Sequence, residues 1–448
     1  MGEATLGFIA IARTTFDVAL AEQVTATARE NLQQAGFTLV GPEALVTTLD
    51  EAQAAATDMM RDPPDLLILF QATFADSTMV MQIAEAVDAP LLLWAVPEER
   101  TGARLRLNSL CGINLAGHAL RRAGKHYEYV YGKPDDAAAL QKVEVVAAAA
   151  RAYWSLRGAR IGSIGEHPAG FDTCDYDVAT IAYRFGVEVV SISLEDEFFP
   201  MARKSNTNEI SIAFEALRER VDGLDGVDEK AVKGTLGVYA GMRELSTQEG
   251  LSGLAVRCWP EFFTELGCAA CGAMSMMTDG GVPCSCEADV NGTITQLALQ
   301  AVSGEAAFGA DVVAVDDERD ALVVWHCGLA PLSMCDPEVR PQAALHSNRK
   351  LPLLMEFPLK PGRVTVARLS EATGSYRLVI GSAEMLCAPK SFSGTSGVLK
   401  FERRAAAVLD TILSEGLEHH ISLTYGDHTN ALMTLAKMLE LPVLHLTP

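Results

Sequence analysis

Short apolar runs alternate with helix-like segments along residues 1–157, and this alternation restricts the fold more than any other feature of the sequence. The apolar runs lie at residues 7–12, 66–70 and 91–95, and the helix-like segments at residues 16–35, 108–123 and 136–156. Strands spaced by helices of this length favour βαβ units and a parallel sheet. Such sheets meet their ligands at the carboxyl ends of the strands, where this sequence has Arg13, Thr73, Phe74 and Asp76.

The rest of the chain contains two further regions of different pattern. Residues 160–165 open a second alternating unit, which continues to an apolar strand at residues 251–257. From about Asp316, short runs alternate with a period of two and are separated by glycine, proline and serine, which is typical of an antiparallel sheet or barrel. We predict an α/β chain with two N-terminal parallel-sheet, Rossmann-like domains at residues 1–157 and 158–320 and a β-rich, barrel-like domain at residues 321–448.

The charge balance excludes several classes of partner. The 58 acidic side chains outnumber the 36 basic ones and give a net charge of −22. An acidic surface repels phosphate backbones, so we expect no binding to nucleic acid. The sequence has no apolar run of about 18 residues that would span a membrane. It also shows no export signal, so we expect a cytoplasmic protein whose ten cysteines are reduced thiols.

Two motifs invite a functional interpretation that we do not favour. Gly162 and Gly165 follow a strand but lack the spacing of a dinucleotide or phosphate loop, so they indicate a tight turn. A zinc or iron–sulfur site could be read into four cysteines, Cys268, Cys271, Cys284 and Cys286. Their surroundings are strongly apolar, and free cysteine is among the most buried residue types, so we prefer packed thiols.

Three carboxylates in one stretch are the best candidates for chemistry. Glu261 follows an apolar strand, at whose carboxyl end its side chain would project. Glu287 and Asp289 are two residues apart, so in an extended segment they would point the same way. Asp289 also precedes a helix-like run at residues 293–301, and capping that helix is an equally good explanation for it.

A pair of histidines far downstream provides candidate imidazole ligands. His419 and His420 precede a strand-like run, so they are expected to face opposite sides and only one of them to enter a given pocket. Two carboxylates with one imidazole suit a divalent ion such as Mn²⁺ or Mg²⁺. His326 is a candidate further contact, although a hydrogen-bonded residue at a strand end is the simpler interpretation.

Four segments, in this order along the chain, carry a family pattern: Arg257-Cys258-Trp259-Pro260-Glu261, Cys286-Glu287-Ala288-Asp289-Val290-Asn291-Gly292, His326-Cys327-Gly328 and His419-His420. Together they resemble the L-fucose isomerase and L-arabinose isomerase superfamily. The likeness covers most of the chain, including the N-terminal parallel-sheet unit and the β-rich C-terminal part. It implies an aldose–ketose isomerase that works through an enediol.

The resemblance also implies a ligand set and its roles. The fucose-like branch would hold Mn²⁺, or alternatively Mg²⁺ or Co²⁺, through Glu261, Asp289 and His420. The arabinose-like branch uses two glutamates and two histidines, which would bring in Glu287 and His326 instead, and we favour the fucose-like set because Asp289 precedes Asn-Gly. Glu261 and Asp289 would then be the acid/base residues. The metal would bind two adjacent sugar oxygens and stabilise the enediolate.

Further contacts and a homo-oligomer follow from the same resemblance. Candidate substrate contacts are Arg257, Trp259, His419 and Arg13, with Arg13 reaching the site from an adjacent chain of a trimer or hexamer. The small-molecule partner would be a sugar. Two alternatives stay open: a non-catalytic sugar-binding or regulatory homologue, and an isomerase for a sulfonated, phosphorylated or branched sugar. For an anionic sugar, Arg257 is the first cation to consider.

Overall fold

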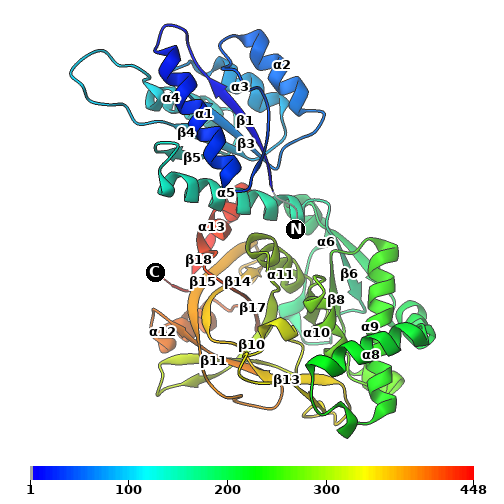
Figure 1. Cartoon of the computed structure of the whole chain (residues 1–448). Coiled ribbons are helices and arrows are strands. Elements are labelled where there is room, and N and C mark those ends of the chain that lie inside the picture. Colours follow the sequence, from blue (N-terminus) through cyan, green and yellow to red (C-terminus); the bar gives the residue numbers. More distant parts are fainter. Residues whose placement is uncertain (1–3, 448) are drawn as a thin grey trace. The chain divides into compact units, whose positions relative to one another are not determined.

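The computed structural model describes residues 4–447. The chain divides into two compact units, Met1–Trp154 and Ser155–Pro448. Figure 1 shows the first unit in blue to cyan and the second in green to red. No helix within residues 4–447 is both long enough and apolar enough to span a membrane.

The first unit is built on a parallel sheet with strand order β2-β1-β3-β4-β5. Its strands are β1 (Thr5–Ile11), β2 (Thr38–Val40), β3 (Leu66–Gln71), β4 (Leu91–Ala95) and β5 (Glu128–Tyr131). Its helices are α1 (Val18–Gln34), α2 (Leu49–Met59), α3 (Ser77–Ala86), α4 (Ser109–Arg122) and α5 (Ala137–Leu156). Every residue of β3 and β4 is buried, as expected for strands covered by helices on both faces. The predicted parallel sheet is confirmed.

The second unit begins with another parallel sheet, with strand order β7-β6-β8-β9. Its strands are β6 (Arg160–Ile164), β7 (Glu188–Ile192), β8 (Gly253–Val256) and β9 (Cys284–Cys286). The helices of this region are α6 (Val178–Phe185), α7 (Phe199–Lys204), α8 (Thr207–Arg220), α9 (Glu229–Glu249), α10 (Cys271–Asp279) and α11 (Val290–Ser303). The carboxyl ends of β8 and β9 lie side by side, since Val256 pairs with Cys286. This brings Arg257–Glu261 next to Glu287.

A closed barrel follows in the same unit. The strands β16-β11-β10-β17-β14-β15 form a ring that the β15–β16 pairing closes. They are β10 (Phe308–Asp316), β11 (Ala321–His326), β14 (Gly362–Ser370), β15 (Arg377–Leu386), β16 (Thr395–Phe401) and β17 (His420–Tyr425). Around them lie β12 (Gln342–Ala344), β13 (Leu354–Pro358), β18 (Val443–His445), α12 (Ala405–Ser414) and α13 (Thr429–Met438). The predicted barrel is confirmed, and it already begins at β10.

Helix α11 joins the parallel sheet to the barrel. It contacts β8 on one side and the barrel strands β14 and β17 on another (Figure 1). Its first residues follow β9 directly, so the turn between Cys286 and Val290 lies where sheet and barrel meet. One hydrophobic core includes residues from both parts. This packing places the loops after β8 and β9 beside the ends of β10, β11 and β17.

Candidate active site

His420 is the centre of the polar cluster at this junction. It is the first residue of β17 and is buried. Its Nδ1 lies 3.0 Å from Oδ2 of Asp289, while its Nε2 lies 3.5 Å from Oδ1 of Asp311 and 3.8 Å from Oε2 of Glu287. Because a carboxylate accepts and does not donate, Nδ1 is the donor and Nε2 is left to face the other two carboxylates. Burial disfavours the charged ring, yet hydrogen bonding and attraction by Asp289 and its neighbours raise the pKa of His420.

Asp289 connects His420 to a buried arginine. Its Oδ1 accepts the backbone N–H of Gly292 at 2.8 Å, which makes it the N-cap of α11. Its Oδ2 accepts from Arg368 Nη1 at 2.5 Å as well as from His420. Burial opposes the ionised carboxylate, but the charge of Arg368 and the bond from His420 hold the pKa of Asp289 far below its ordinary value. Both oxygens are therefore already engaged, and the capping role considered for this residue is present.

Glu287 lies on a sharp turn and contacts both histidines. Glu287 and Ala288 have φ values of 58° and 54°, so the segment is left-handed, and the extended geometry expected for it is wrong. Oε1 of Glu287 accepts from Trp259 Nε1 at 3.0 Å, and Oε2 lies 2.9 Å from His419 Nε2. Burial raises the pKa of Glu287, but the His419 hydrogen bond and the charge of His420 outweigh it and lower the pKa.

Both rings of the histidine pair reach the same cluster. Their centroids are 3.9 Å apart, and both lie near Glu287. The expectation that only one of them could enter a pocket is therefore wrong. The reason is local: His419 sits on a bend before β17 begins, so strand alternation does not apply to it. Thr173 lies 2.7 Å from Nδ1 of His419 and fixes the outer ring.

His326 and Asp311 complete the wall on the barrel side. Asp311 is the register partner of His420 on β17 and of Trp325 on β11. Asp311, His326 and His420 offer ligand atoms within 4.8 Å of one another. The backbone N–H of Cys327 donates to Nδ1 of His326 at 2.8 Å, so the ring proton lies on Nε2, which can donate to a substrate. Burial and the nearby His420 hold the pKa of His326 well below its ordinary value.

Glu261 is held by an arginine and not by this cluster. It forms a two-pronged ion pair with Arg257, with Nε–Oε2 and Nη2–Oε1 distances of 2.9 Å. Burial opposes the charged form, but the Arg257 hydrogen bond and charge lower the pKa of Glu261. In the part of the chain that the structure describes, Glu261 belongs to none of the groups that could hold an ion. Of the three expected ligands, the structure brings together Asp289 and His420.

A cavity of about 250 Å³ opens beside the cluster. Its lining includes Trp259, Glu287, Asp311, His326, His346 and Arg349. The guanidinium of Arg349 lies 4.9 Å from the ring centre of Trp259 and 5.3 Å from that of Phe263. Among residues 4–447, no carboxylate forms an ion pair with Arg349, whereas Arg257 is paired with Glu261. The free cation on this wall is thus Arg349, where the sequence had suggested Arg257.

The remaining sequence candidates lie together in the first unit. Arg13 forms an ion pair with Asp76, its backbone N–H donates to Thr73 Oγ1 at 2.8 Å, and its guanidinium lies 5.8 Å from the ring centre of Phe74. Asp76 also caps α3. The carboxyl ends of β1 and β3 therefore meet as the parallel-sheet argument requires.

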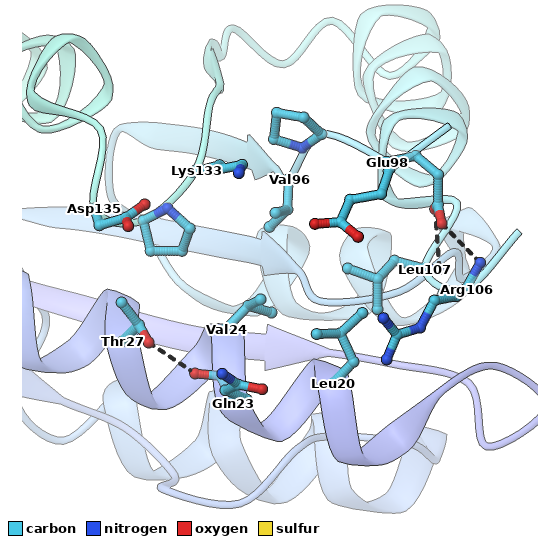
Figure 2. A pocket seen from close by; sticks show the side chains of 13 residues that line it. Leu20, Gln23, Val24, Thr27, Val96, Glu98, Arg106, Leu107, Lys133 and Asp135 are labelled. Carbon is cyan, nitrogen blue, oxygen red and sulfur yellow. Dashed lines mark hydrogen bonds between the residues drawn. The ribbon is translucent and has the colours of Figure 1, made fainter. Parts of the chain in front are cut away.

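The first unit also has a cavity, of about 240 Å³, between α1 and the segments that follow β4 and β5. Figure 2 shows Glu98 turned toward the backbone of Arg106 and Leu107, with Lys133 and Asp135 at the other side. The Glu98 carboxylate accepts three backbone N–H groups, from Arg106 at 2.7 Å, Leu107 at 3.0 Å and Asn108 at 2.7 Å. These bonds fold the loop onto itself and leave the carboxylate without free lone pairs directed at the cavity.

Three residues of the site escaped the sequence analysis. Asp311 and Arg368 are charged residues in the interior of the apolar strands β10 and β14, and a charge at such a position is itself a signal of a buried partner. Arg349 lies in a polar loop that gave no signal. The four cysteines grouped from their spacing do not lie together in the structure. The sulfur of Cys258 instead contacts that of Cys286, and the sulfur of Cys271 contacts that of Cys327. All ten cysteines lie in the described range as free thiols.

Comparisons with known proteins identify the family of this chain. The N-terminal domain model of fucose/sulfoquinovose isomerases matches residues 7–157, and the C-terminal domain model of L-fucose isomerase matches residues 355–447. A protein from Alkalicoccus urumqiensis named sulfoquinovose isomerase is 33% identical over 99% of both chains. One of the same name from Priestia aryabhattai is 32% identical over 98% of this chain and 99% of its own.

Among solved structures, a solute-binding protein of a Burkholderia multivorans transporter is 14% identical and matches 63% of this chain and 86% of its own. Its TM-score is 0.20, so this likeness supports no conclusion.

The fucose isomerase family is metal-dependent in general, and its members are aldose–ketose isomerases. The two relatives are more than 30% identical to this chain over almost its whole length, which places it in this family. The chain belongs to the L-fucose isomerase family.

Proposed function

We propose that this chain converts a sulfonated aldose into the corresponding ketose with the help of a divalent cation. Relatives named sulfoquinovose isomerase, similar to almost the whole chain, support the substrate class. The observation that carries the proposal is the group of carboxylates around His420, on the wall of a cavity that also has an unpaired Arg349. An isomerase for a sulfonated sugar is one of the two alternatives that the sequence left open.

The donor atoms around His420 fit a divalent cation. Oδ1 of Asp311 is buried and has no hydrogen-bond partner among the described residues, yet it lies 3.5 Å from His420 Nε2. A buried acceptor without a partner costs about 1–3 kcal/mol, and burial raises the pKa of Asp311. A cation held by Glu287, Asp311 and His420 would remove this cost, and Nε2 of His326 would donate a hydrogen bond to the bound sugar. Oxygen and imidazole ligands suit Mn²⁺, with Mg²⁺ and Co²⁺ as alternatives.

When bound, the cation supplies Lewis-acid polarisation of neighbouring sugar oxygens. The residues behind it orient the ligands. Asp289 accepts a hydrogen bond from the Nδ1–H group of His420, and Arg368 in turn holds the Asp289 carboxylate in place. Together these two bonds keep the His420 ring in one tautomer and one orientation. Because both its oxygens are engaged, these contacts favour a positioning role for Asp289 over direct ligation.

Glu287 is our candidate for the base that removes the C2 proton. Aldose–ketose isomerisation moves a proton between adjacent carbons, and a carboxylate ionised at neutral pH can accept it. The lowered pKa of Glu287 keeps it in that form, and Trp259 fixes its orientation. Glu261 remains the candidate second acid/base group. It would reach a substrate by exchanging one of its two hydrogen bonds to Arg257.

Arg349 is our candidate for recognition of the sulfonate. An anionic substrate must approach a chain of net charge −22, so it needs a cation in the cavity. Stacking on Trp259 and Phe263 holds the guanidinium over the cavity without neutralising it. An arginine also matches the geometry of a tetrahedral oxyanion with two parallel hydrogen bonds.

The homo-oligomer, a trimer or hexamer, remains a proposal. Light scattering on the purified protein tests it, and a monomer at working concentration would contradict it. In such an assembly the Arg13 cluster is the surface we propose to meet a neighbouring chain.

An isomerase assay on the full chain tests the function. We expect conversion of sulfoquinovose with Mn²⁺ present, loss of activity after chelation, and recovery when Mn²⁺ is added back. The unsulfonated aldoses glucose and fucose are the controls and should be converted far less efficiently. Equal activity on the sulfonated and unsulfonated sugars would contradict the substrate class. No activity on any sugar, with Mn²⁺ bound, would favour the non-catalytic homologue.

A further inference from the structure

Four thiols lie along the wall of the same cavity, and the reaction above uses none of them. Cys258 and Cys286 follow the neighbouring strands β8 and β9 and their sulfurs are 2.6 Å apart. Cys271 begins α10, Cys327 follows β11, and their sulfurs are 3.2 Å apart. All four side chains are buried and all four line the cavity.

One pair of these thiols has an imidazole beside it. Cys271, Cys327 and His346 offer three ligand atoms within 4.8 Å of one another, although they are far apart in the sequence. His346 lies on the loop before β13, where the backbone N–H groups of Asn348 and Arg349 approach its Nδ1 at 3.3 and 3.4 Å. These two backbone contacts orient the ring beside the thiols.

The donor set differs in chemical kind from the cluster around His420. Two sulfurs and one nitrogen are soft ligands, which prefer Zn²⁺ and its heavier relative Cd²⁺ over Mn²⁺ or Mg²⁺. The group around His420 consists of carboxylate and imidazole donors and has the opposite preference. The two groups share the cavity wall, since Asp311 and His326 line it together with Cys271 and Cys327.

We propose that Cys271, Cys327 and His346 form a second metal site for a thiophilic divalent ion, Zn²⁺ or Cd²⁺, and that an ion there blocks the sugar cavity. Binding replaces the two S–H bonds by two sulfur–metal bonds and releases two protons to solvent, without any change of oxidation state. Three protein ligands leave the fourth tetrahedral position toward the cavity. Because Cys271, Cys327 and His346 line the same cavity as Glu287 and Asp311, an ion with its open position toward that cavity would compete with the sugar. The block rests on the proposed function, whereas the site itself does not.

Cadmium titration of the full-length, reduced, Mn²⁺-loaded protein tests the site. Thiolate–Cd²⁺ bonds give an ultraviolet charge-transfer band, so binding is seen whether or not the protein is active. We expect the band to saturate at one Cd²⁺ per chain and to be lost in Cys271→Ser and Cys327→Ser. Cys284→Ser is the matched control, because Cys284 is equally buried but does not line the cavity.

His346→Gln is a further variant, chosen because this half-buried residue can be replaced without disturbing the packed core. It should weaken Cd²⁺ binding and retain the band. Absence of the band at one equivalent, or its persistence in Cys271→Ser, would overturn the site. The block is tested with sulfoquinovose: Cd²⁺ should inhibit the wild type and spare Cys271→Ser. Bound Cd²⁺ that leaves turnover unchanged would overturn the block, and an inactive wild type without Cd²⁺ would instead count against the proposed function.

Discussion

The cavity beside α1 in the first unit and the cavity beside the barrel have nearly equal volumes, about 240 and about 250 Å³, but different chemistry. In the first, Glu98 accepts three backbone N–H groups and Arg106 forms an ion pair with Asp17. In the second, Asp311 has a buried oxygen without a partner among the described residues, and Arg349 lacks an ion pair there. Volume therefore does not distinguish a candidate active site, whereas unsatisfied charge does.

The strongest test of this contrast removes the imidazole at the centre of the polar cluster beside the second cavity. His420→Gln should lose the divalent cation and with it about 10²-fold or more of kcat/KM, because the cation contributes several kcal/mol of transition-state stabilisation. His428→Gln is the matched control, since His428 bonds the carbonyl of Tyr425 outside the cluster. Metal content and kcat/KM should fall together in the first variant only. A His420→Gln protein of wild-type activity would remove the cluster from the reaction.

Two aspartates that cap helices differ in how deeply their ion pairs are buried, so their substitution should change the free energy of unfolding by different amounts. Asp289 and Asp76 each cap a helix and pair with an arginine, but the Arg368 pair is 1% exposed while the Arg13 pair is 46% and 37% exposed. Asp289→Asn removes one of the two carboxylates paired with the buried Arg368 and leaves Glu418, so unfolding should become easier by about 3 kcal/mol. Asp76→Asn keeps a good N-cap and loses one partly exposed ion pair, so it should cost less than about 1 kcal/mol. Urea unfolding measures both.

Because Asp289 is proposed to position the metal ligand His420, the Asp289→Asn variant can also be tested through its affinity for Mn²⁺. Loss of a partner behind a metal ligand lowers metal affinity by about 10–100-fold, so turnover should recover at high Mn²⁺. If saturating Mn²⁺ restores nothing while the protein is folded, Asp289 is a direct ligand or an acid/base group, as the family resemblance implies.

The unpaired arginine can be tested through KM. Arg349→Met keeps the stacking surface and removes the charge, so KM for sulfoquinovose should rise about 10-fold, the value of one charge-assisted hydrogen bond. The kcat value should change little. Arg319→Met, which removes an exposed arginine paired with Asp316, is the control. A KM that is unchanged in Arg349→Met would assign sulfonate recognition to another cation.

The smallest effect is expected in the first cavity. Burial opposes the ionised Glu98, but the backbone N–H groups of Asn108, Arg106 and Leu107 prevail and lower its pKa. A carboxyl whose folded pKa is depressed adds stability above its unfolded pKa of about 4.3, and this stability is lost as the pH falls through the folded pKa. Glu98→Gln should thus destabilise the first unit by about 1 kcal/mol at neutral pH and by less in acid, with isomerase activity unchanged.

Much of this architecture could be predicted from the sequence because its signals are local. The apolar runs at β1, β3 and β4 and the period-two strands of the barrel are visible in short windows. The pairing of Asp289 with His420 was likewise reachable, because both residues belong to a family motif. Closure of the barrel through β15 and β16 required the whole chain.

What sequence reasoning missed depends on long-range register and backbone conformation. Asp311 enters the site because it lies opposite His420 on β17, a pairing between residues far apart in the chain. Glu287 reaches both histidines because its backbone is left-handed, which no alternation rule predicts. Glu261 lies beyond the end of β8, at the start of the helical turn that follows, and Arg257, four residues before it, takes both of its oxygens. Local spacing identifies candidates, and the neighbours decide their roles.

The central claim is that Glu287, beside His420, moves the C2 proton of the sugar. Deuterium incorporation from D₂O tests this most directly, because it reports proton removal even when net conversion is slow. With saturating Mn²⁺ and sulfoquinovose, the wild type should incorporate deuterium at C2, and Glu287→Gln should incorporate none above background while remaining folded. Exchange in Glu287→Gln at the wild-type rate would contradict the account.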